Sequence, residues 1–139
     1  MHGQRSRPWQ IILALVFFAY AAVSAIAESE VQPGLIELEL ERPPTPQEAV
    51  WIQVRAATLP RGVEIRVSTR DGTLLGTVSS LGESRGREIV TYAIPLPETA
   101  IVNNRVQLRL EVDEPGAPVR APRPDEVEGV NLVYVPISN

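Results

Sequence analysis

The chain has 139 residues, with 13 basic residues against 17 acidic ones and a formal net charge of −4. It contains no cysteine and no lysine, and its only histidine is His2. Such an acidic chain lacks the basic surface that favours nucleic-acid binding, so we expect no nucleic-acid partner. Without cysteine no disulfide can form, and a domain of this size must be held by its apolar core alone.

The N-terminus has the pattern of a secretory signal peptide, residues 1–27, expected to be helical. Two arginines precede the uncharged apolar run Ile11–Val23, and the small-x-small sequence Ala25-Ile26-Ala27 follows it. Cleavage after this site would leave residues 28–139 as an exported protein, periplasmic or secreted. The alternative is an uncleaved membrane anchor, since the apolar stretch approaches the roughly 17–25 residues that span a bilayer. We expect membrane contact only in that second case.

Apolar and polar residues alternate through most of the chain after Gly34, which is typical of half-buried strands. Asp71-Gly72 lies between two such runs and predicts a hairpin turn, because both residues tolerate positive φ. Two of the runs, 88–96 and 130–137, have apolar residues on both faces, as strands lying against another surface do. The predicted strands are 35–41, 50–55, 63–68, 73–79, 88–96, 105–112 and 130–137.

These strands predict one all-β domain, residues 28–139, built as a single antiparallel β-sandwich. Turns recur about every 8 to 12 residues, which favours an immunoglobulin-like or jelly-roll arrangement, with a partly open barrel as the alternative. No segment after residue 27 has a convincing helical period with caps. We expect no internal repeat.

Missing residue types limit the chemistry. After residue 27 the chain has no histidine, cysteine or lysine, which excludes the usual hydrolytic triads, Schiff-base lysines and zinc or copper sites. The row Glu37, Glu39 and Glu41 could supply a carboxylate pair for glycoside hydrolysis. Glutamates that alternate with leucines are more often a solvated strand face, so we expect no enzyme and no catalytic residue.

The longest segment without a strand pattern runs from Asp113 to Gly129 and contains four prolines. Loops of this length are usually functional or disordered. If its ends converge, their carboxylates could bind calcium, which takes oxygen ligands in flexible geometry. Otherwise Arg120 and Arg123 neutralise them as exposed ion pairs. The candidate calcium ligands are Asp113, Glu114, Asp125, Glu126 and Glu128; no other cofactor is expected.

Other candidate binding residues lie in turns and on one strand. Arg85 and Arg87 flank a glycine, and arginines in such turns can bind an anion together with backbone N–H groups, although most are only solvated. Arg120 and Arg123 form a second candidate pair. Trp51 falls on the polar side of its strand, where it could stack on a sugar or contact a partner protein. A one-residue error in register would instead bury it in the core.

These observations lead to three hypotheses. The first is a non-enzymatic exported module that binds another protein of the cell envelope. The second is a carbohydrate-binding or carbohydrate-active domain that uses Trp51 and surface carboxylates. The third is a membrane-tethered envelope protein of structural role.

Overall fold

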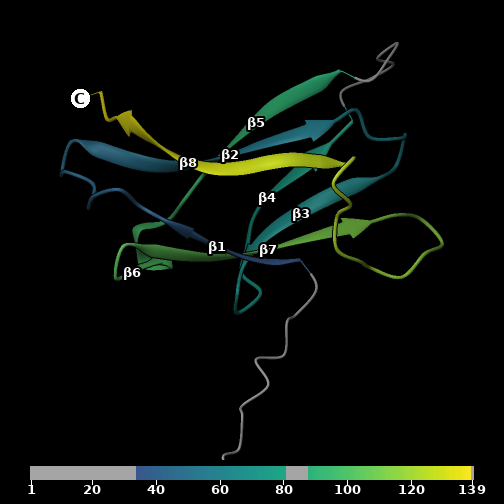
Figure 1. The fold of residues 1–139 in the computed structure, drawn as a ribbon, viewed down its shortest axis with the longest axis horizontal. Helices are drawn as coiled ribbons and strands as arrows, with labels where there is room; N and C mark the ends of the chain where they lie inside the picture. Colours follow the sequence, from purple (N-terminus) through teal and green to yellow (C-terminus); the bar gives the residue numbers. More distant parts are fainter. Residues whose placement is uncertain (1–33, 81–87, 139) are drawn as a thin grey trace, which may run out of the picture.

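The computed structural model describes residues 34–80 and 88–138 (Figure 1). The predicted signal peptide, 1–27, and the turn residues Arg85 and Arg87 lie outside this part. No helix among the described residues is long and apolar enough to cross a membrane. The elements are β1 (Leu35–Glu39), β2 (Glu48–Ala57), β3 (Glu64–Thr69), β4 (Leu74–Ser79), β5 (Ile89–Pro95), the 3₁₀ turn η1 (Glu98–Ala100), β6 (Ile101–Val102), β7 (Arg105–Asp113) and β8 (Val127–Pro136).

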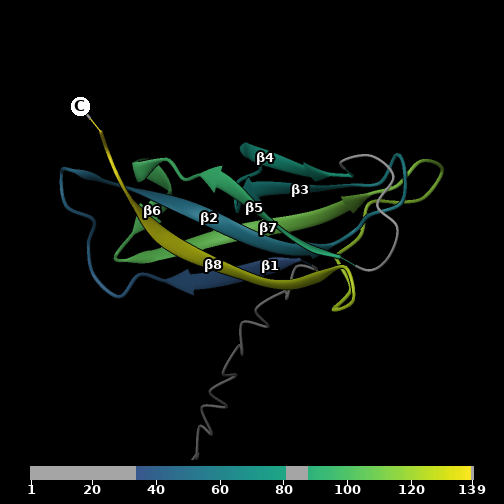
Figure 2. The same cartoon turned by 90° about the horizontal axis from the view of Figure 1, so that it is seen from above.

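The strands form two antiparallel sheets, which confirms the predicted all-β class. The larger sheet has the order β1-β7-β3-β4, and the short β6 also pairs with β7. The smaller sheet has the order β5-β2-β8. In Figure 1 the strands of the smaller sheet lie above β1 and β7, and Figure 2 shows β2 and β8 running across the strands of the larger sheet. β2 and β7 are therefore central strands, one in each sheet.

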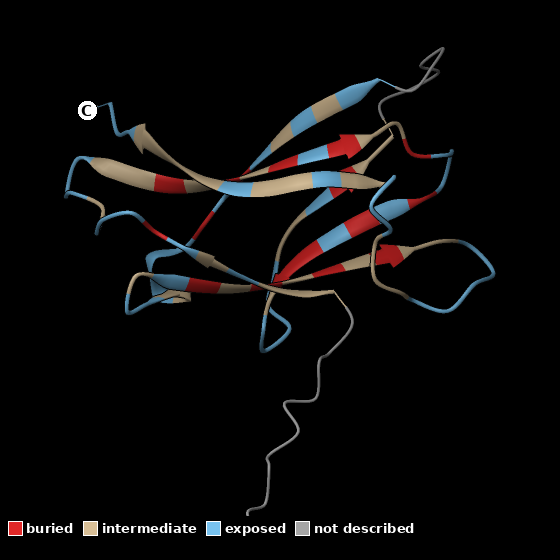
Figure 3. Cartoon of the chain, in the orientation of Figure 1, coloured by how far each residue is buried: buried red, intermediate tan, exposed pale blue. Residues whose placement is uncertain are grey.

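The core lies between the sheets and is filled by alternate residues of both. In β2 from Val50 on, and in β7 from Val106 on, every second side chain is at most 3% exposed, and these buried positions appear as red bands in Figure 3. Ile65 and Val67 of β3 join the same cluster. Because successive side chains of a strand point to opposite faces, the alternation in the sequence becomes one buried face on each sheet. The eight buried residues of the two central strands are Val50, Ile52, Val54, Ala56, Val106, Leu108, Leu110 and Val112.

Two turns depend on residues that tolerate positive φ. The predicted hairpin joins β3 to β4, with Gly72 at φ 95°. A second tight turn, Asn103-Asn104, joins β6 to β7 with φ values of 51° and 59°. Both residues lie in the left-handed region, as a type I′ hairpin requires, and asparagine is one of the few residues that adopt it readily. The sequence analysis missed this turn together with the two-residue strand before it.

The chain does contain an internal repeat, contrary to our expectation. Residues 42–48 read RPPTPQE and residues 120–126 read RAPRPDE, so both have the pattern R-x-P-x-P-x-E. The first segment leads from β1 to β2 and the second from β7 to β8. Each therefore carries the chain from the larger sheet to the smaller one. The spacer between strand and motif is longer in the second copy, so the two copies are not at a constant offset.

Strand pairing follows the same repeat. When the two motifs are aligned, Gln53 of β2 corresponds to Asn131 of β8, and these residues face each other in the ladder. Likewise 35–41 (LIELELE) aligns with 105–111 (RVQLRLE), and Glu37 faces its equivalent, Gln107. A local two-fold axis passes between each such pair of equivalent residues, so β1 is related to β7 in the larger sheet and β2 to β8 in the smaller one. β3, β4, β5 and β6 have no equivalent among the described residues.

Candidate functional site

The outer face of the larger sheet is polar and cross-linked. Gln107 of β7 donates to Glu37 Oε2 at 3.0 Å and accepts from Arg70 Nη1 at 3.0 Å. Arg105 Nη1 lies 3.4 Å from the other oxygen of Glu37. Opposite charges on neighbouring strands stabilise a sheet modestly, and exposed pairs contribute little. The outer face of the larger sheet is therefore a solvated polar surface, as expected for the glutamates of β1.

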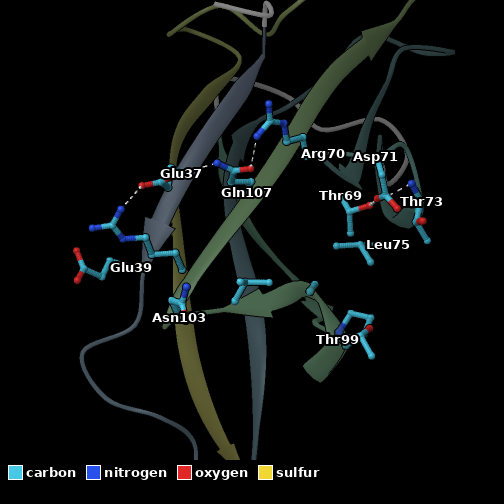
Figure 4. Close-up of a pocket in the computed structure, with 14 residues that line it drawn as sticks. Glu37, Glu39, Thr69, Arg70, Asp71, Thr73, Leu75, Thr99, Asn103 and Gln107 are labelled. Carbon is cyan, nitrogen blue, oxygen red and sulfur yellow. Dashed lines mark hydrogen bonds and ion pairs between the residues drawn. The ribbon is translucent and has the colours of Figure 1, made fainter. Parts of the chain in front are cut away.

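A shallow groove of about 1060 Å³ lies beside this network. Figure 4 shows Glu37, Gln107 and Arg70 in a row along one side, with Thr69, Asp71 and Thr73 grouped on another. No aromatic residue lines the groove, so it offers no platform on which a sugar ring could stack. Its lining residues are Glu37, Glu39, Thr69, Arg70, Asp71, Thr73, Leu75, Pro97, Thr99, Ala100, Val102, Asn103, Arg105 and Gln107.

The outer face of the smaller sheet is different, because it carries apolar side chains around Trp51. Trp51 points away from the core and is partly buried, on the same side as Gln53. Its neighbours in the ladder are Val133 on β8 and Pro95 on β5. Next along the sheet, Ala49 pairs with Val135. We call Ala49, Trp51, Pro95, Val133 and Val135 the Trp51 face.

The predicted carbohydrate site is not brought together by this fold. Trp51 lies on the outer face of the smaller sheet, whereas Glu37 and Glu39 lie on the larger one, with the core between the sheets. A sugar bound by both would have to pass around the edge of the domain.

The five carboxylates considered for calcium each face an arginine. Within residues 34–80 and 88–138, no group of three or more histidine, cysteine or acidic residues is placed to hold a metal ion. The arrangement matches the alternative interpretation, in which arginines neutralise the loop. The pairs are Asp113 with Arg66, Glu114 with Arg120 at 3.9 Å, Asp125 with Arg123 at 3.7 Å, Glu126 with Arg120 at 2.6 Å, and Glu128 with Arg55 at 3.0 Å.

The loop before β8 is folded back on β7 rather than extended. Arg120 and Val112 exchange backbone hydrogen bonds of 3.3 and 2.7 Å. The Arg120 guanidinium contacts both oxygens of Glu126, at 2.8 and 2.6 Å, and the backbone N–H of Arg123 donates to Glu126 Oε2 at 2.8 Å. These hydrogen bonds lower the pKa of Glu126 to about 2, and those from the Arg120 side chain contribute most. The ion pair of Arg120 and Glu126 therefore closes the loop, and we call such an arginine–glutamate pair a clamp.

An equivalent clamp closes the connection from β1 to β2. Arg42 contacts both oxygens of Glu48, at 2.7 and 2.8 Å, and Thr45 N–H donates to Glu48 Oε2 at 3.1 Å. The hydrogen bonds from Arg42 contribute most to lowering the pKa of Glu48 to about 2. Tyr134 of β8 places its ring 4.2 Å from the guanidinium carbon and donates its hydroxyl hydrogen to the Arg42 carbonyl. The sequence analysis missed all these residues; the repeated motif was the available signal.

The lowered pKa values of Glu48 and Glu126 argue against acid–base catalysis at the two clamps. A general acid needs a raised pKa, and the pKa values of Glu48 and Glu126 are both lowered.

No protein-family model, no curated protein and no solved structure matches the chain. The function must therefore be inferred from the surfaces of the domain.

Proposed function

We propose that the domain is an immunoglobulin-like β-sandwich in which the first and last strands have exchanged sheets. With its seven longer strands lettered A to G, the sheets read A-F-C-D and E-B-G. An immunoglobulin constant domain has ABED and CFG, and variable domains add a strand next to C. The neighbours B–E and C–F are common to both arrangements. D lies beside C instead of E, in the place where variable domains add a strand, and exchanging A with G accounts for the remaining difference.

We further propose that the protein is an exported, non-enzymatic module that binds another protein through the Trp51 face. The observation that supports this is the contrast between the two outer faces. The larger sheet presents a charged network, whereas the smaller one presents a tryptophan among apolar side chains. Tryptophan is enriched among the residues that dominate protein–protein binding, and polar side chains at the margin complete such an interface. Gln53 and Arg55 supply that margin on the same strand.

The alternatives have less support. A protein ligand has more support than a sugar, since the groove lacks aromatic residues and Trp51 stands apart from the carboxylates of β1. The absence of histidine, cysteine and lysine after residue 27 supports a binding role over hydrolysis. A retained N-terminal anchor would tether the same module to the membrane without changing its binding face.

Affinity capture from the host's own envelope extract tests this proposal. The tagged full-length protein is compared with Trp51→Ala and with Leu74→Ala, a control that removes a 57% exposed apolar side chain from the other sheet. We expect Trp51→Ala to reduce recovery of the specific partner at least roughly tenfold, as for an interface hot spot. Leu74→Ala should leave it unchanged. Equal recovery with both variants would contradict binding through the Trp51 face.

A further inference from the structure

Two of the four edge strands, β1 and β4, have features that discourage pairing with another chain. β1 has five residues, two of which are the glutamates of its outer face. β4 has a register shift opposite Val67. β5 has no charge and ends in a proline, Pro95, but it has only seven residues. β8 is the longest of the four: it has ten residues, a single charge at Glu128, and a proline only at its last position. Long, apolar and uncharged edges are the ones that pair with additional strands.

One side of β8 has unpaired backbone groups. Along an antiparallel strand, alternate residues hydrogen-bond to the same neighbour. Ile137 N–H donates to the Gln47 carbonyl at 2.8 Å, so the residues at alternate positions before it, including Val133 and Asn131, also bond toward β2. Leu132 and Val130 therefore direct their N–H and C=O groups to the outer edge. β8 has no strand on that edge within the described residues.

The internal two-fold relation identifies what this edge lacks. β2 and β8 are equivalent strands that pair with each other, and the far edge of β2 is covered by β5. The two-fold axis places the far edge of β8 in the position equivalent to that covered edge. The chain supplies a strand for the first position and, among the residues described, none for the second. The occupant that fits is an extended strand, antiparallel to β8, with apolar side chains at alternate positions.

We propose that β8 pairs with β8 of a second copy of this chain, so that two three-stranded sheets join into one continuous sheet. β8 itself has the required alternation. In a register centred on Asn131, Val130 bonds with Leu132 of the second copy and Leu132 with Val130. Pro136, which has no N–H, then falls outside this ladder, whereas a register centred on Leu132 would place it opposite Glu128. The proposal is independent of binding through the Trp51 face.

Charge is also compatible with this pairing. Glu128, the only charged residue of β8, falls opposite Tyr134 of the second copy, so no two carboxylates face each other. Self-pairing of β1 would instead bring Glu37 and Glu39 opposite glutamates of the other copy, which is unfavourable. Asn131 faces Asn131 across the two-fold axis, where the amides can hydrogen-bond to each other. The dimer contact is therefore assigned to the smaller sheet alone.

Cysteine cross-linking tests the register, because the chain has no cysteine of its own. In this arrangement Asn131 forms a non-hydrogen-bonded pair with its copy, with Cβ atoms about 4.5–5.5 Å apart, close to disulfide distance. We expect Asn131→Cys to oxidise to a covalent dimer under mild conditions. Thr91→Cys, exposed on the opposite edge of the same sheet, is the matched control and should remain largely monomeric. Equal cross-linking of both variants would overturn the proposal.

Sedimentation equilibrium of the unmodified protein tests the association itself. We expect the mass to rise from monomer toward dimer with concentration, and Asn131→Lys to weaken association at least roughly tenfold by placing two ammonium groups opposite each other. Thr91→Lys makes the same charge change at the opposite edge of the sheet and should not weaken association. Melting temperatures should show that both variants fold. Trp51→Ala should still dimerise. A protein that stays monomeric to about 1 mM overturns the proposal and assigns the edge to a strand of a different protein.

Discussion

Glu48 and Glu126 occupy equivalent positions in the two halves of the repeat, and each is bound by the arginine that begins its motif. The side chain of Glu126 is only 13% exposed, against 22% for Glu48. Solvent screens an exposed ion pair, so the more buried glutamate should contribute more to stability. Of the two clamps, the one before β8 is therefore the better test of what these contacts do.

Glu126→Gln should lower the free energy of unfolding at neutral pH by about 1–2 kcal/mol, because it removes charge-assisted hydrogen bonds while preserving the shape of the side chain. The pKa of Glu126 falls from 4.5 to about 2 on folding. Its stabilising effect is thus complete above about pH 4.5 and is lost as the pH falls toward 2. Urea denaturation of both proteins between neutral and acidic pH should show their difference shrinking with acid.

Asp125→Asn is the control for this change, since the Asp125 side chain is 67% exposed. We expect its unfolding free energy to differ little from that of the unmodified protein. A loss of stability as large as that of Glu126→Gln would mean that net charge, rather than the clamp, is responsible.

Leu110→Ala should cost about 2–5 kcal/mol, the range for removing a buried leucine side chain without refilling its space. Leu110 is 3% exposed in the central strand of the larger sheet. Its neighbour Glu111 points to the outer face, so Glu111→Ala should change stability by less than about 0.5 kcal/mol. Denaturant titration measures both values, and the reverse order would contradict the register of β7.

At the scale of elements, the repeating unit is a strand, a proline-rich connection closed by a clamp, and a second strand. Prolines fix φ in the connection, and the arginine–glutamate pair joins its two ends. Both connections pass from one sheet to the other, so they also set how the sheets are joined. The long segment before β8 is thus a structural connection whose acidic residues already have arginine partners.

Calcium should therefore have almost no effect on stability. A ligand that binds only the native state raises its melting temperature by mass action, and a calcium site would do so at millimolar concentration. Because Asp113, Glu114, Asp125, Glu126 and Glu128 each face an arginine, binding would first require breaking these pairs. Thermal melts with and without about 5 mM calcium, with magnesium as the control, measure this. A rise of many degrees with calcium alone would show a real site.

At the scale of the whole molecule, the two sheets present different surfaces to the surroundings. The larger sheet has a charged outer face, which keeps that face solvated, and a short edge strand, β1, which discourages pairing with another chain. The smaller sheet has the Trp51 face and the open edge of β8. Both proposed contacts therefore fall on the smaller sheet, one on its face and one at its edge, and can be tested separately.

Export is a property of the whole chain, and its test is the mature N-terminus. If residues 1–27 are a cleaved signal, N-terminal sequencing of the protein recovered from the periplasm or the medium should begin at Glu28. Replacing Ala27 with a bulky residue should block cleavage and leave the precursor in the membrane fraction, because the peptidase requires a small residue there. Ala22→Leu, within the apolar run, should still be cleaved. A protein that keeps Met1 in membranes would support the anchor.

The amino-acid sequence by itself determined the features that depend on neighbouring residues. The alternation in β2 and β7 predicted which side chains are buried, because period two belongs to the backbone of any single strand. Asp71-Gly72 predicted the hairpin between β3 and β4, since a positive φ is also a requirement on the residues of the turn themselves. Alternation also predicted the outward orientation of Trp51, with burial through a one-residue error in register as the alternative.

Only the tertiary structure decided which strands are neighbours and which charges meet. Asp113 could belong to a calcium site or to an ion pair until β3 brought Arg66 to it, diagonally across the ladder, since such neighbours depend on register between distant segments. The two-fold relation also depends on Gln53 facing Asn131, a pairing between distant segments. Whether a strand is central or at an edge is likewise a property of the assembled sheet, and for that reason the open edge of β8 could not be predicted from its residues.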